Sequence, residues 1–574
     1  MSNSMNYPTF LKEVDRVISN CDMDSLRQFV HDLARKEREC KREEFFDTLV
    51  RFCGVSEEKS EDKKAEEKSL ADKIDEVIEA LDDIQSGNRN LIGSYVEEYD
   101  DWDDYYENEY NFEDPEDILN DVQIAINLIH TCLDHEEYAK GAELALRLSK
   151  LRVQVTGDYE DYEGECEIDL DSLLYKDLIS GSREEIVKEC VYLACLGNDE
   201  ENSAEAMVPI IDNFNGYRIK LDDILTMGLN EIDLNTFLPH WIKALAKRAL
   251  KADDLLVEAQ DMLQDKDIIL ANAHRYAQSH PILYKNILSK GLKDTTSEEM
   301  LQIGLRGIKE VSKSDIRSDI ALLTAKYALE EKQVQIAEEC WLEAFRSSVT
   351  IVNYLRLRLE SRNWGDYAEE ARRIYMSYYK KVSSDSDERA KKAMIMFFDG
   401  RFEEVINQFM NPEKGIGWSY TFMKQGIALC LMLLVDKYIN GLGLSKMKGR
   451  VIEATSFSVK SYCEGTNLLV TRSNADFFQK CFDKWKTQVE ISEDLKRTLV
   501  EKIKQWIAMR VESITSANRR NYYEECASFI SAYGEVLESL GHRGAKKKIM
   551  LEYKSEYPRR SAFHRELRLY GMGK

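Results

Sequence analysis

The sequence predicts an all-α fold, an irregular α-solenoid of helical hairpins that follows a small N-terminal helical bundle. Three observations predict it. The chain has 574 residues but only 7 Pro and 27 Gly, so long stretches are free to form helices. Apolar residues recur at spacings of three and four along most of the chain, as one face of a helix requires. Short motifs also recur at intervals of about 34 residues.

The composition excludes several classes of protein. Hydrophobic residues make up 43% of the chain, too many for a disordered protein. The 79 basic and 105 acidic side chains give a net charge of −26, and we do not expect a nucleic-acid partner because such a chain repels phosphate. The longest apolar run, residues 427–435, is too short to cross a bilayer, and the N-terminal residues lack a signal-peptide pattern, so we expect no membrane contact.

Cysteine usage favours a reduced, cytoplasmic protein. The twelve cysteines are scattered along the chain and contain no CxxC pair. Most have apolar neighbours on helical patterns, where cysteine behaves as a small hydrophobic residue. We therefore expect neither disulfides nor a structural zinc site.

Composition also divides the chain into segments. They are a small helical bundle at 1–55, a charged linker at 56–69, a helical-repeat solenoid at 70–410, a glycine-containing region at 411–475, and a C-terminal helical region with a basic tail at 476–574. The linker has Ala65 as its only apolar residue. Its mixed charge without a hydrophobic face indicates a solvated tether.

Two acidic stretches interrupt the predicted solenoid. Residues 97–117 hold twelve carboxylates and no Lys or Arg, and residues 158–171 hold eight carboxylates and no base. We expect both to be loops. Six aromatic residues lie between the carboxylates of the first stretch, and they would be an exposed apolar liability unless they pack against something. Four interpretations remain open for these loops: a solvated segment without a specific role, or a site that contacts a partner protein, a divalent cation or the chain's own basic tail.

Helix-start motifs give the repeat period. Tyr367 and Phe402 lie 35 residues apart, each after a polar turn. Stepping back 34 residues from Tyr367 reaches Gln333, and a further 33 reaches Met300. The pattern resembles tetratricopeptide-like repeats, most clearly over residues 295–410, although the terminal Pro of that consensus is absent. The resemblance implies hairpins that stack to bury their apolar faces and build a superhelix.

The glycine-containing region departs from this pattern. Seven glycines fall within residues 411–475, and residues 440–450 lack a strong hydrophobic period. Neither GxxxxGK[ST] nor GxGxxG occurs, so the glycines do not predict a phosphate site. We expect a hinge loop at 440–450, with Lys446, Met447 and Lys448 accessible to proteases.

The C-terminal region becomes basic. Residues 541–574 carry ten Lys or Arg against three Glu. Residues 518–527, which begin Asn-Arg-Arg-Asn-Tyr-Tyr, and residues 557–567, which begin Tyr-Pro-Arg-Arg, resemble the helical region that follows the zinc finger in bacterial SWIM zinc-finger proteins. The resemblance covers about 120 residues, and the CxC…CxH zinc ligands are missing because no CxC occurs. It implies a helical module for partner binding, with neither metal nor catalytic activity.

These patterns point to a site for binding rather than for catalysis. Neither HExxH nor GxSxG occurs, so we expect no catalytic residues, no cofactor and no metal site. The candidate partner-binding residues are Tyr99, Trp102, Asp103, Asp104, Tyr105 and Tyr106 in the acidic stretch and Arg559 and Arg560 in the basic tail.

The sequence thus predicts a cytoplasmic, bacterial, non-catalytic scaffold or adaptor that binds one or more proteins. Two alternatives are left. One is a regulatory component of a bacterial defence or stress system that acts through nucleic-acid contact or through cleavage at 440–450. The other is an enzyme whose active site assembles from distant positions. The sequence does not specify the oligomeric state.

Overall fold

The structure is a computed structural model. It describes Thr48 and residues 69–95, 110–157, 167–199, 201–214, 219–227, 233–248, 252–381, 386–436 and 441–573. The chain divides into two compact units, Met1–Lys73 and Ile74–Lys574. Nearly all of the first unit lies outside the described residues. The bundle predicted at 1–55 also lies outside them, except for Thr48. The same holds for the linker predicted at 56–69, except for Ser69.

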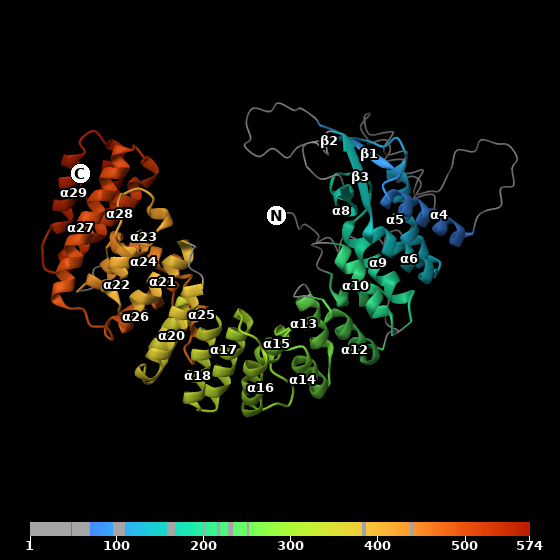
Figure 1. Cartoon of the computed structure of the whole chain (residues 1–574), viewed down its shortest axis with the longest axis horizontal. Coiled ribbons are helices and arrows are strands. Elements are labelled where there is room, and N and C mark those ends of the chain that lie inside the picture. Colours follow the sequence, from blue (N-terminus) through green and yellow to red (C-terminus); the bar gives the residue numbers. More distant parts are fainter. Residues whose placement is uncertain are drawn as a thin grey trace, which may run out of the picture. The chain divides into compact units, whose positions relative to one another are not determined.

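A small α/β segment forms the start of the second unit, and its first helix begins four residues before Ile74 (Figure 1). Its elements are α4 (Leu70–Gln85), β1 (Asn90–Tyr95), β2 (Tyr110–Glu113), α5 (Ile118–Asp134), α6 (Tyr138–Lys150), β3 (Arg152–Gly157), β4 (Glu167–Asp169) and α8 (Leu170–Tyr175). The strands form one sheet in the order β2-β1-β3-β4, in which β1 and β3 are parallel and the two outer pairs are antiparallel. Leu91 of β1 pairs with Val155 of β3, and both side chains are fully buried.

This sheet corrects the sequence analysis, which predicted no strands. The acidic stretches at 97–117 and 158–171 were expected to be loops, but β2, β4 and the start of α8 lie within them. Residues 97–109 and 158–166 lie outside the described residues. The strands are only three to six residues long, so each contributes too few alternating side chains to stand out from the helical pattern around it.

Helices follow one another through the middle of the chain. They are α9 (Arg183–Leu196), α10 (Ser203–Asn213), α11 (Leu221–Leu225), α12 (Leu234–Leu245), α13 (Asp253–Met262), α14 (Lys266–Arg275), α15 (Ile282–Lys290), α16 (Ser297–Glu310), α17 (Asp315–Glu330), α18 (Val334–Ser347), α19 (Ile351–Glu360), α20 (Gly365–Lys381), α21 (Ser386–Phe398) and α22 (Phe402–Phe409). The predicted all-α, helical-repeat class is confirmed, with the small sheet as its exception.

Local chemistry explains why these helices start and pack as they do. Thr296 and Glu299 form a capping box at the start of α16, which satisfies backbone N–H groups that the helix leaves unpaired. Helices α16, α17 and α18 contact one another in sequence order. A Cβ at Gly304 would lie 2.2 Å from the hydroxyl oxygen of Thr324, so the approach of α16 to α17 depends on a glycine there.

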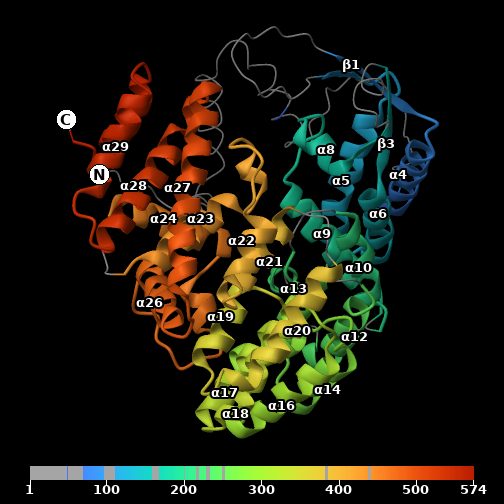
Figure 2. The same cartoon turned by 60° about the vertical axis from the view of Figure 1, so that its left-hand side comes forward.

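The C-terminal third is also helical. Its elements are η3 (Trp418–Tyr420), α23 (Met423–Leu434), α24 (Leu442–Thr455), α25 (Val459–Cys463), α26 (Asn474–Lys486), α27 (Glu493–Ser516), η4 (Arg520–Tyr522), α28 (Tyr523–Ser539), α29 (Ala545–Glu556) and α30 (Ser561–Leu569). Helix α28 is enclosed on several sides, because it contacts α23, α24, α27, α29 and α30 (Figure 2). One hydrophobic core runs from Leu301 to Met572 and crosses the boundaries predicted at residues 410 and 475.

Residues 440–450 were predicted to form a hinge loop, and this prediction is wrong for the residues that the structure describes. Residues 442–455 form α24, and Met447 is fully buried. Gly443 serves helix packing, because a Cβ there would lie 2.2 Å from the backbone N of Ala532 in α28. The buried carboxylate of Glu535 accepts hydrogen bonds from the backbone N–H groups of Gly443 and Leu444, which stabilises the helix start.

The segment after α24 folds back onto the middle helices. The indole Nε1 of Trp341 donates to the carbonyl oxygen of Gly465 (2.8 Å), and the hydroxyl of Tyr462 donates to Glu360 (2.7 Å). Arg356 of α19 donates to the backbone carbonyl oxygens of Ser461 and Tyr462. These contacts join residues more than 100 positions apart in the sequence.

Candidate functional site

The six candidate residues in the acidic stretch, Tyr99, Trp102, Asp103, Asp104, Tyr105 and Tyr106, lie outside the described residues. The two basic candidates lie in the turn between α29 and α30. Arg559 is exposed, whereas Arg560 is half-buried and donates from Nη1 to the Oδ1 of Asn518 (2.8 Å). This hydrogen bond places the α29–α30 turn against the α27–η4 turn.

The two turns together present four arginines, Arg519, Arg520, Arg559 and Arg560, which we call the arginine corner. Arg519, Arg520 and Arg559 are exposed, and within the described part of the chain their guanidinium groups make no hydrogen bond or ion pair. Asn518, at the start of the first turn, has a φ of 50°, a left-handed conformation that Asn tolerates better than most residues. The arginine corner is therefore a cationic surface whose three exposed guanidinium groups have no counterion among the described residues.

Packed aromatic rings beneath the arginine corner hold its two turns in place. The ring of Phe563 lies 5.5 Å from that of Tyr523 and 6.2 Å from that of Tyr557, measured between centroids. Phe563 is fully buried. Because these rings come from η4–α28, from the end of α29 and from α30, they hold the two arginine-bearing turns to one core.

A buried ion-pair network supports the same region. Arg510, only 2% exposed, donates from Nε (2.9 Å) and Nη2 (2.7 Å) to one carboxylate oxygen of Glu525, and Lys424 Nζ lies 2.6 Å from the other oxygen. The guanidinium of Arg510 also lies 5.1 Å from the ring centroid of Tyr522 and 5.3 Å from that of Trp418. The network thus joins the arginine corner to the loop that carries Trp418.

This region also includes Lys446, Met447 and Lys448, which the sequence analysis placed in a protease-accessible loop. Lys446 Nζ lies 3.3 Å from the carboxylate of Glu524, and the hydroxyl of Tyr570 donates to the same carboxylate. Met447 packs in the core, and Lys448 is half-buried on α24. Helical, partly packed backbone is a poor protease substrate, so the predicted accessibility of Lys446, Met447 and Lys448 is not supported.

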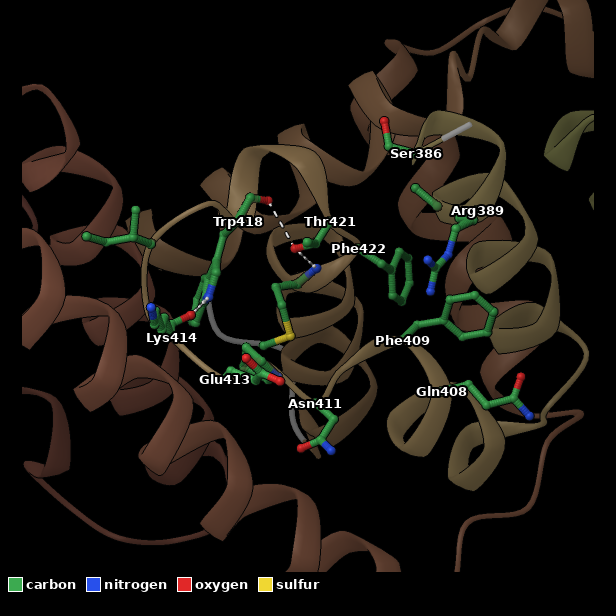
Figure 3. Close-up of a pocket in the computed structure, with 14 residues that line it drawn as sticks. Ser386, Arg389, Gln408, Phe409, Asn411, Glu413, Lys414, Trp418, Thr421 and Phe422 are labelled. Atoms are coloured by element: carbon green, nitrogen blue, oxygen red, sulfur yellow. Dashed lines mark hydrogen bonds between the residues drawn. The ribbon is translucent and has the colours of Figure 1, made fainter. Parts of the chain in front are cut away.

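A pocket of about 560 Å³ opens between α21, α22, the 411–417 loop, η3 and the start of α23 (Figure 3). Figure 3 shows Arg389 on one side of it together with Phe409 and Phe422, and Glu413, Lys414 and Trp418 on the other. Within the described residues, the side chains of Arg389, Gln408, Asn411 and Glu413 make no hydrogen bond or ion pair. We call this cavity the Arg389 pocket.

One wall of the Arg389 pocket is fixed by its contacts with α27. The carbonyl oxygen of Gly415 accepts from Arg510 Nη1 (2.7 Å), and a Cβ at Gly415 would lie 2.2 Å from the carbonyl oxygen of Met509. The indole Nε1 of Trp418 donates to the carbonyl oxygen of Lys414 (3.0 Å). Ile416, between these anchors, is 39% exposed and lines the pocket.

A titratable cluster lies elsewhere, among α14, α15 and α16. The carboxylate of Glu310 receives hydrogen bonds from the hydroxyl of Tyr284 (2.5 Å) and from Arg306 Nε (2.8 Å), and it pairs with His274 Nδ1 (2.8 Å). Burial alone would raise the pKa of Glu310, but the hydrogen bonds from its three partners lower it to about 2.

Replacing Glu310 with glutamine is expected to reduce the loss of folding stability that occurs as the pH falls. A lowered pKa stabilises the fold at a pH above the unfolded value near 4.5, and this contribution is lost as the pH falls towards 2. Between pH 6 and pH 3 the native chain should therefore lose on the order of 1 to 2 kcal/mol more than Glu310→Gln, after allowance for partial exposure. Urea unfolding of both proteins at both pH values measures this difference in stability. Equal losses in the native chain and in Glu310→Gln would contradict the hydrogen bonds assigned to the Glu310 carboxylate.

The described residues contain neither a metal-binding cluster nor an exposed cysteine. There, no group of three or more His, Cys, Asp or Glu side chains is arranged to hold a metal ion, and no helix is both long and apolar enough to cross a membrane. The eight cysteines of this part of the chain are buried free thiols. Burial raises the pKa of Cys340 and of Cys526 to about 12, which keeps both protonated at neutral pH.

Comparison of the sequence with models of known protein families finds no match, and a search of curated proteins finds no similar sequence. Sequence reasoning identified Arg559 and Arg560 but not Arg519, Arg520 or the Arg389 pocket. The Arg-Arg pair at 519–520 was the available signal, because it repeats the Arg-Arg pair at 559–560. The pocket gave no comparable signal, since its walls come from several separate segments.

Proposed function

We propose that the protein is a non-catalytic scaffold or adaptor that binds an acidic segment of a protein partner at the arginine corner. The observation that carries this proposal is the set of three exposed guanidinium groups, of Arg519, Arg520 and Arg559, on adjoining turns without an internal partner in the described residues. Guanidinium groups bind carboxylates through paired hydrogen bonds, which favours an Asp- or Glu-rich ligand.

Charge favours a short acidic protein segment over nucleic acid. The net charge of −26 gives the chain as a whole an unfavourable field for any long polyanion. Nucleic acid carries charge along its whole length and would extend beyond the corner, whereas a short acidic segment can be confined to it. The eight buried free thiols support a reducing location, and we propose the cytoplasm.

The first experiment uses the full chain and a labelled peptide of ten glutamates. The variant Arg519→Glu/Arg520→Glu/Arg559→Glu is expected to bind this peptide at least about tenfold more weakly than the native chain, in fluorescence polarisation at low salt. Arg560 is left in place because its hydrogen bond to Asn518 holds the two turns together.

The matched control is Lys293→Glu/Lys313→Glu/Lys504→Glu, which makes the same change in net charge at three exposed lysines elsewhere. It is expected to bind the peptide nearly as well as the native chain. Equal weakening in both triple variants would overturn the proposal, because only the net charge would then matter. Tighter binding of a 20-nucleotide single-stranded DNA than of the peptide would also overturn it, in favour of nucleic acid.

A further inference from the structure

The Arg389 pocket combines an apolar lining with polar groups that the fold itself does not use. Phe409, Phe422 and Ile416 supply the apolar surface, and Ile416 remains 39% exposed. Around them lie Arg389 and Glu413, which make no hydrogen bond or ion pair within the described residues. A volume of about 560 Å³ falls within the usual range for ligand pockets.

The placement of charge indicates the kind of ligand. Arg389 lies beside the two phenylalanines, and Glu413 lies on the opposite side of the pocket (Figure 3). A purely anionic ligand such as a fatty acid would satisfy Arg389 or Lys414 but meet the carboxylate of Glu413. A peptide can satisfy both, because an acidic side chain pairs with Arg389 while backbone N–H groups donate to Glu413.

The wall of the Arg389 pocket formed by residues 415–418 is preformed. Gly415 is held against α27 by Arg510, and Trp418 is held by the carbonyl oxygen of Lys414, so the loop between them is fixed before any ligand arrives. A preformed wall reduces the entropy that a ligand would otherwise lose by ordering it. The exposed Ile416 side chain therefore offers a rigid apolar contact to an incoming side chain.

We propose that the Arg389 pocket binds an internal segment of a partner peptide, with a large apolar side chain against Phe409 and Ile416 and a neighbouring Asp or Glu side chain on Arg389. This site is separate from the arginine corner, and the proposal does not depend on binding there. Both sites use acidic residues of a ligand, but only the Arg389 pocket requires an apolar residue next to them.

The experiment uses a defined probe, a labelled octapeptide with a central Glu-Leu-Glu sequence and both ends blocked. The native full chain is expected to bind it saturably below 1 mM in fluorescence polarisation, and Arg389→Gln is expected to weaken binding about tenfold. The same peptide with its leucine changed to serine should bind about tenfold more weakly as well. Circular dichroism and thermal unfolding establish that Arg389→Gln is folded.

Two controls make the result specific. Arg373→Gln removes another arginine, whose side chain is 70% exposed on the neighbouring helix α20, and it should leave affinity unchanged. The triple arginine-corner variant should retain most of the leucine dependence, so failure at one site is distinguishable from failure at the other. Absence of saturable binding, an Arg389→Gln variant with native affinity, or equal affinity for the leucine and serine peptides would each overturn the proposal.

Discussion

Replacing Arg356 with methionine is expected to lower the free energy of unfolding by about 3 kcal/mol. The Arg356 side chain is fully buried and donates to the carbonyl oxygen of Tyr462 (3.0 Å), to the Oδ1 of Asn353 (2.6 Å) and to the carbonyl oxygen of Ser461. Burial lowers the pKa of Arg356 to about 10, so the group still carries its charge at neutral pH.

Methionine can fill much of the same volume but donates no hydrogen bond, so it would leave two buried acceptors and the part-buried carbonyl oxygen of Ser461 without this donor. The hydrogen bonds it breaks are among those that join α19 to α25. Urea unfolding followed by circular dichroism measures the loss. The control Arg373→Met changes an exposed arginine on α20 and should shift stability by no more than about 0.5 kcal/mol. Equal effects of the two substitutions would contradict this role for Arg356.

Replacing Gly443 with alanine is expected to destabilise the fold by about 3 kcal/mol or more. The new Cβ would lie 2.2 Å from the backbone N of Ala532 and 2.7 Å from its Cα. Backbone atoms of a packed helix cannot move aside as a side chain can, so α24 and α28 would have to separate. The hydrogen bonds from the Gly443 and Leu444 N–H groups to Glu535 would then lengthen as well.

A second glycine on α24 provides a control for the Gly443→Ala substitution. Gly449 lies on the same helix, and a Cβ there would meet nothing within 4 Å. Gly449→Ala should therefore raise stability by up to about 1 kcal/mol, because alanine favours the helix. Thermal and urea unfolding of the two variants give the comparison. Similar stabilities for Gly443→Ala and Gly449→Ala would contradict the close crossing of α24 and α28.

The same two glycines show why sequence reasoning succeeded for the helices but failed at residues 440–450. Helical periodicity in residues 295–410 reflects one-sided burial, and the helices there are present as predicted. In α24, Gly443 is one of the glycines that suggested a loop, yet it is required by contact with a helix that begins about 80 residues later. A local pattern cannot distinguish a glycine that permits a turn from one that permits close helix packing.

The binding surfaces illustrate the same limit. Arg559 and Arg560 could be singled out from the sequence because the tail is basic, but Arg519 and Arg520 join them through tertiary contacts, namely the Asn518–Arg560 hydrogen bond and the packing of Phe563 on Tyr523 and Tyr557. The Arg389 pocket depends on how α21, α22 and the 411–417 loop meet, which no single segment specifies. Local composition predicts which residues are charged, whereas tertiary packing decides which of them face a common ligand.

Site-specific photo-crosslinking at the arginine corner tests the central proposal most directly. A benzophenone amino acid in place of Asn521, which is exposed beside Arg520, would be activated in the native host, and the captured peptides identified by mass spectrometry. The proposal predicts protein segments rich in Asp and Glu, captured there and not from a matched position at Lys293. Capture of nucleic acid instead, or of segments no more acidic than those captured at Lys293, would contradict it.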